Sequence, residues 1–147
     1  SWGNTVNDSI TKLVEEAIAG TATINTWSAN SATLSTANGA TAESRNAILN
    51  LTDTSTSLSG AATVIVPALS KIFIVKNGTA QTVTVKTASG TGVAVTAGET
   101  CFVFCDGTNV VEALDRVAGN FNVGGNLTVD GNATITGTTT LMEGLSH

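Results

Sequence analysis

The sequence has few of the residues that carry charge or catalytic chemistry. Among its 147 residues there are no tyrosines, one proline and one histidine, and charged side chains make up 12%. The single histidine is His147, so none lies within the chain where a Ser-His-Asp or Cys-His site would need it. With 6 Lys and Arg against 11 Asp and Glu, the chain lacks the cations that hold a nucleic-acid backbone or an anionic membrane surface. We therefore expect no nucleic-acid partner.

Cysteine is scarce as well, and its spacing excludes two kinds of site. Cys101 and Cys105 lie in one strand-like run. Four residues of extended chain separate their Cα atoms by about 13 Å, whereas a disulfide requires about 7 Å or less. No further Cys or His lies at metal-ligand spacing from them. We expect two reduced, buried thiols, with pairing between chains as the alternative, and no metal or cofactor.

Other signatures of function are missing too. No apolar run reaches the roughly 18 residues that a membrane-spanning helix needs, so no membrane insertion is expected. The Gly-x-Gly at residues 90–92 leads into a strand-like run and not into a helix, which excludes a phosphate-binding loop. No pair of carboxylates is identified that could cleave a glycosidic bond. The chain is predicted to be non-enzymatic, with no catalytic residues.

Small polar residues and β-formers dominate what is present. The chain contains 26 Thr, 13 Asn and 15 Gly, and 41% of its residues are hydrophobic. Thr and Val favour strands, whereas Gly and Asn favour tight turns. The composition predicts a folded, mainly β protein. The patterns along the chain divide it into a short N-terminal α-helix, an antiparallel β-sandwich or barrel domain and a C-terminal hexad-repeat, trimeric β-shaft.

Domain 1–19 has the apolar spacing of a helix. One stripe, at intervals of three or four residues, is formed by Val6, Ile10, Leu13, Val14, Ala17 and Ile18. A helix of this length is unstable alone in water, so its stripe must dock on the β domain, on sister helices or on another protein. The residues expected at a contact with a partner are Trp2, Val6, Ile10 and Leu13.

Four aromatic or acidic side chains in and near this helix carry predictions of their own. Trp2 precedes the helix and either anchors it in a partner or staples it locally. Trp27 is predicted to lie in the core. Glu15 and Glu16 are adjacent in sequence, so they diverge on a helix, and both are expected on a solvated face.

The middle of the chain divides into a connector and a clearer β domain. Residues 20–59 form a low-complexity, β-rich connector, with strands expected near 21–27 and 47–53. Residues 60–117 contain six strand-like runs at a spacing of about ten residues, separated by Gly turns such as Asn77-Gly78, which predicts an antiparallel sandwich or small barrel. The six runs are 62–66, 72–76, 81–86, 92–95, 101–105 and 110–114.

Domain 118–147 contains a six-residue repeat. Four units begin at Asn120, Asn126, Asn132 and Thr138, and three of them close with Gly. A unit with two apolar residues on one side cannot bury them alone, and four units are too few for a single-chain β-helix. Three chains side by side would bury them along a common axis. The expected trimer core is Phe121, Val123, Leu127, Val129, Ile135 and Leu141, and an exposed hairpin tail is the alternative.

Three segments carry a family resemblance. The repeat Gly-Asn-Leu-Thr-Val-Asp-Gly-Asn-Ala-Thr-Ile-Thr-Gly at 125–137 resembles the shafts of bacteriophage tail fibres. The start at residues 2–10 and the block at 75–110 are similar to proximal parts of such fibres. The resemblance implies a homotrimeric structural protein in the virion tail. Its N-terminal end would attach to an adaptor- or nozzle-type tail protein, and the fibre would extend toward the host for adsorption.

Two other readings remain open at this point. A trimeric stalk of a bacterial surface adhesin would share the repeat architecture. An ice-binding protein would use Thr-x-Thr spacing such as Thr82/Thr84, although the arrays are short and irregular.

Overall fold

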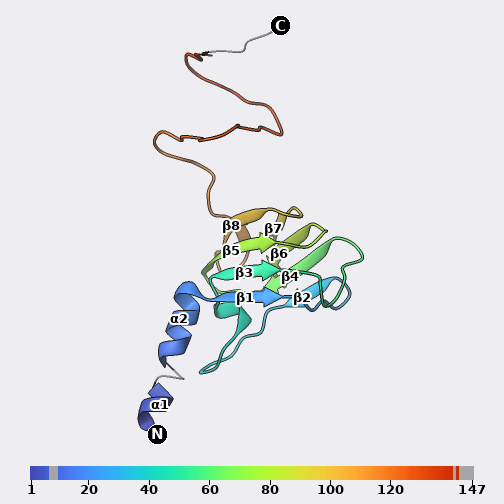
Figure 1. Ribbon diagram of the computed structural model, residues 1–147, viewed down its shortest axis with the longest axis vertical. Coiled ribbons are helices and arrows are strands. Elements are labelled where there is room, and N and C mark those ends of the chain that lie inside the picture. The colour runs from blue at the N-terminus through green and yellow to red at the C-terminus, as the bar shows by residue number, and fades with distance from the viewer. Residues whose placement is uncertain (7–9, 141, 143–147) are drawn as a thin grey trace. The chain divides into compact units, whose positions relative to one another are not determined.

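The computed structural model describes residues 1–6, 10–140 and 142 (Figure 1). These residues fall into two compact units, 1–116 and 117 onward. The helices of the first unit are α1 (Trp2–Val6), α2 (Lys12–Ala19) and the 3-10 helix η2 (Glu43–Arg45). Its strands are β1 (Thr21–Ile24), β2 (Ser31–Thr33), β3 (Ile48–Leu51), β4 (Ala62–Val66), β5 (Lys71–Asn77), β6 (Val83–Thr87), β7 (Gly92–Val95), β8 (Thr100–Cys105) and β9 (Val110–Glu112).

The strands form two sheets, and the mainly β prediction is confirmed. One sheet has five strands in the order β1-β3-β5-β8-β9, and the other has four in the order β2-β4-β6-β7. Neither sheet, as described, closes into a barrel. The supposed connector 20–59 supplies β1, β2 and β3, so it is part of both sheets and does not merely link the helix to a later domain.

The prediction of a purely antiparallel domain is wrong. β1, β3 and β5 pair in parallel, as do β2, β4 and β6. From β1 to β6 the chain changes sheet after every strand. Two consecutive strands of one sheet are therefore separated by a strand of the other sheet, and they run in the same direction. The turn at Asn77-Gly78 therefore joins two sheets and does not form a hairpin. Antiparallel pairing is confined to β5–β8, β6–β7 and β8–β9.

One hydrophobic cluster is shared by both sheets. Every second residue of a strand points inward. The parallel register places inward residues of neighbouring strands side by side: Leu51 of β3 pairs with Ile24 of β1 and with Asn77 of β5. Trp27 is 5% exposed and belongs to this cluster, so its prediction as a core residue is confirmed. Its indole N–H donates to the backbone oxygen of Thr52 over 2.8 Å, which fixes the loop after β1 to the loop after β3.

Asn77 is a buried polar residue whose amide is fully used. Its Nδ2 donates to the backbone oxygens of Gln81 (2.8 Å) and Val95 (2.9 Å), and its Oδ1 accepts from the backbone N–H of Thr79 (3.0 Å) and from its hydroxyl (2.8 Å). These hydrogen bonds fix the segment that connects β5 to β6. They are buried, so water would not replace a hydrogen-bond partner that a substitution removed.

Asn77→Leu is expected to lower the free energy of unfolding by about 3 kcal/mol, because each buried polar group left without a partner costs about 1–3 kcal/mol. Urea unfolding followed by circular dichroism measures the loss. Asn50→Leu, at a half-buried outward position of β3, is the matched control and should change stability by less than about 1 kcal/mol. Equal losses would contradict the role given to the Asn77 network.

The second unit has no helix or strand in residues 117–140 and 142. Every described residue from 117 to 140 is exposed. The strands expected in the hexads are therefore not formed in this single chain, which leaves the β-shaft a prediction about the assembled protein.

Candidate functional site

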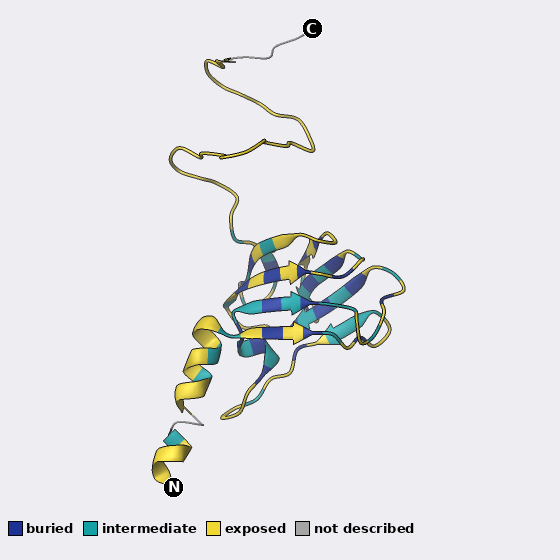
Figure 2. Ribbon diagram, viewed as in Figure 1, coloured by how far each residue is buried: buried dark blue, intermediate teal, exposed yellow. Residues whose placement is uncertain are grey.

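The N-terminal helices expose most of their apolar stripe (Figure 2). Trp2 is 83% exposed, Ile10 58% and Ile18 74%, whereas Val6 and Leu13 are half-buried. No residue of α1 or α2 is buried. Of the residues expected at a partner contact, Trp2 and Ile10 are therefore exposed, whereas Val6 and Leu13 are partly covered.

An ion pair ties α2 to the β domain. Glu16 Oε2 lies 2.9 Å from Arg45 Nη1, and Glu16 Oε1 accepts from Asn46 Nδ2 over 3.2 Å. The Arg45 guanidinium also donates to the backbone oxygens of Ala37 and Ala40. The expectation that Glu16 is solvated is therefore wrong. The signal was not readable locally, because its partners lie 29 and 30 residues further along the chain.

Glu16→Ala is expected to detach α2 without unfolding the sheets. The side chains of Glu16 and Arg45 are 14% and 22% exposed, and a hydrogen bond to a charged group contributes about 1.5–3 kcal/mol. Amide hydrogen exchange in residues 12–19 should accelerate at least tenfold. Glu15→Ala is the matched control, since Glu15 is exposed on the same helix, and it should leave exchange unchanged. Equal acceleration in both variants would contradict the anchoring role.

The hexad repeat displays a row of uncovered apolar side chains. The exposed fractions are 71% for Phe121, 37% for Val123, 71% for Leu127, 48% for Val129 and 66% for Ile135. Leu141, the last residue expected in the trimer core, lies outside the described residues. The single chain therefore leaves exposed the apolar residues that recur every six positions in the repeat.

The remaining reactive groups have structural explanations. Cys101 and Cys105 are free thiols, and burial, followed by the nearby carboxylates of Glu99 and Glu112, raises the pKa of Cys101. Backbone N–H groups of Asn109 and Thr108 donate to the Asp106 carboxylate, which lowers its pKa and stabilises the β8–β9 turn. Within the part of the chain that the structure describes, no three His, Cys, Asp or Glu side chains gather as a metal site would require.

No family model, curated protein or solved structure matches this chain. Among the described residues, the helices are too short to cross a bilayer. The candidate functional features are thus two exposed apolar rows, one on the N-terminal helices and one on the hexad repeat.

Proposed function

We propose that this chain is a structural, non-enzymatic segment of a homotrimeric virion fibre of the phage-tail type. The observation that carries the proposal is the row of apolar side chains from Phe121 to Ile135, which recurs every six residues and is exposed in the single chain. An isolated chain gains nothing from this row, whereas three parallel chains bury it against one another. Each side chain so buried contributes about 1.5–3 kcal/mol.

In this proposal the three parts of the chain have different tasks. Residues 118–147 become a β-shaft only when three chains pair, so their lack of strands in one chain is the expected state before assembly. The two sheets of residues 20–117 act as a sandwich-like domain that spaces the shaft from the attachment end. The exposed stripe of residues 1–19 docks on an adaptor- or nozzle-type tail protein, so that the other end extends toward the host for adsorption.

Multi-angle light scattering of the intact chain tests the assembly. The expected mass is three times the chain mass of 14.7 kDa, unchanged on dilution through the micromolar range. A monomer mass at all concentrations would overturn the trimeric fibre.

A further inference from the structure

The outward face of the five-stranded sheet is apolar across its centre. Residues in register on neighbouring strands form two adjacent rows. One row is Ile48, Ile74 and Phe102, and the other is Ile72, Phe104 and Val111. We call these six residues the apolar sheet face. Two lysines border this face: Lys76 points outward on β5, and Lys71 lines a hollow beside Ile72, where its Nζ donates to the Ile72 backbone oxygen over 3.4 Å.

This face is exposed to a degree unusual for such residues in a soluble monomer. Ile72 is 57% exposed, Ile74 38% and Phe102 48%. Contiguous apolar surface of this kind marks an interaction site, because leaving it in water forgoes the free energy of burial.

The outward face of the four-stranded sheet is different. One of its rows consists of Ser31, Thr63, Thr84 and Ala94. The adjacent row contains Thr33, Ile65 and Lys86. The same domain therefore has one polar outward face suited to water and one apolar face suited to a partner.

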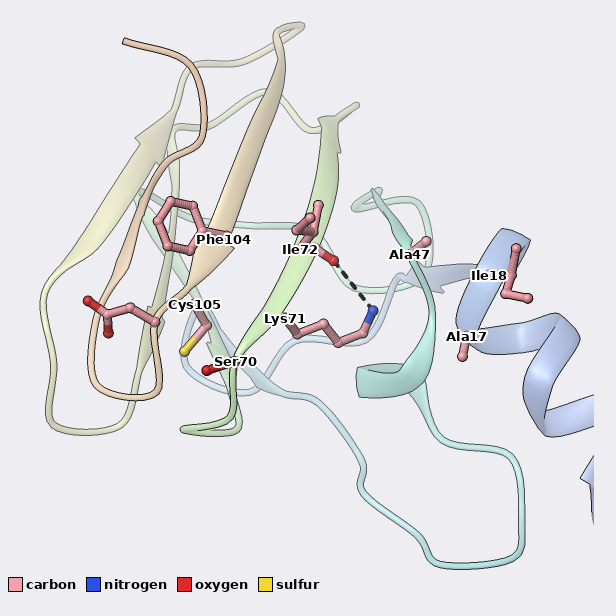
Figure 3. A pocket seen from close by; sticks show the side chains of 9 residues that line it. Ala17, Ile18, Ala47, Ser70, Lys71, Ile72, Phe104 and Cys105 are labelled. Atoms are coloured by element: carbon pink, nitrogen blue, oxygen red, sulfur yellow. Dashed lines mark hydrogen bonds between the residues drawn. The ribbon is translucent and has the colours of Figure 1, made fainter.

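The apolar sheet face continues onto helix α2. Figure 3 shows Ala17 and Ile18 of α2 on the rim of an open hollow whose other side is formed by Ile72 of β5 and Phe104 of β8. Only the C-terminal end of α2, at Ala17 and Ile18, lies beside the sheet face, and the Glu16–Arg45 pair holds that end on the β domain. A partner seated on the sheet face would also cover Ile18.

We infer that the occupant of the apolar sheet face is the same face of the other two copies of this chain, so that the five-stranded sheets surround the three-fold axis. This inference rests on the proposed trimer. Once three shafts associate, their β domains are held together at an effective concentration in the millimolar range, which favours a sister chain over any free protein. The six residues of the face are uncharged, so their copies meet without charge repulsion, while Lys71 and Lys76 lie at its border.

The exposed apolar side chains of the face supply only part of a standard interface. With roughly 150–200 Å² for a full large apolar side chain, the most exposed members present about 400 Å², which is half of the roughly 800 Å² per partner in a standard interface. These members are Ile18, Ile72, Ile74 and Phe102. The half-buried Ile48, Phe104 and Val111 and the neighbouring backbone add to this area.

Pulsed electron–electron resonance on the intact chain tests the arrangement. Nitroxide labels are placed by Ile74→Cys on β5 and, as the matched control, by Thr84→Cys on β6, in a Cys101→Ala, Cys105→Ala background. Both sites are outward positions on central strands. Asn50→Cys, at the edge of the same apolar sheet face, provides a second label that does not intrude on its centre.

Labels at Ile74 and Asn50 should give inter-chain distances shorter than those at Thr84 by roughly 17 Å, since packed sheets lie about 10 Å apart and positions around a three-fold axis are separated by √3 times their radius. Equal or reversed distances in a chain of trimeric mass would overturn the inference, leave the trimer standing and assign the face to a different protein. A monomer mass by light scattering would overturn the proposed function together with this inference.

Discussion

Ile135→Asp is expected to abolish the trimer and leave monomers at micromolar concentration. In the assembled shaft Ile135 would face its two symmetry copies in a dry core, and three carboxylates without partners are very costly there. The shaft would also lose the apolar burial of that layer, about 1.5–3 kcal/mol per chain. Light scattering and thermal unfolding both report the change, with the shaft transition lost while the β-domain transition persists.

Thr134→Asp is the matched control for that substitution. It introduces the same charge one residue away, on the side that faces solvent in a strand. Its effect on the trimer should be small, within about 0.5 kcal/mol for an exposed site. Both side chains are exposed in the single chain, so only the assembled shaft distinguishes them. Equal loss of stability in the two variants would show that the assignment of inside and outside is wrong.

Deletion of residues 1–19 is expected to leave a folded trimer that no longer enters virus particles. The deleted segment contributes no buried residue from α1 or α2, so the core keeps its composition. It does remove the ion pair of Glu16 with Arg45, which should cost only part of the domain's stability. Incorporation is measured by the fibre content of purified particles.

Two further variants distinguish anchoring from folding. Glu16→Ala keeps the apolar stripe but loses its tie to the sheets, and it should reduce incorporation less than the deletion does. Ile10→Glu keeps the tie and places a charge on the stripe at a position that is 58% exposed, so it should block incorporation at normal stability. Normal incorporation of the truncated chain, or its failure to fold, would refute the assignment of the N-terminal end to attachment.

Periodicity in the sequence located most of the elements. It predicted a strand near β1 and near each of β3 to β9, but not β2, because such patterns are local consequences of backbone geometry. The stripe from Val6 to Ile18 predicted one helix, whereas the structure describes α1 and α2. The same local reasoning identified Trp27 as a core residue. The apolar periods of the helix and of the hexads were also visible in the sequence, but whether the chain's own β domain covers the helix stripe was left open there and was answered by the structure.

Pairing was decided by tertiary structure. A Gly turn such as Asn77-Gly78 has the same sequence pattern in a hairpin and in a connection between two sheets. Only long-range packing determines which of the two forms. The tie of Glu16 to Arg45 and Asn46 joins residues 29 and 30 positions apart, beyond any helical or strand period. One sheet has an apolar outward face and the other a polar one. This difference also depends on tertiary structure, because each face is made of residues from neighbouring strands that lie side by side only once the strands are paired.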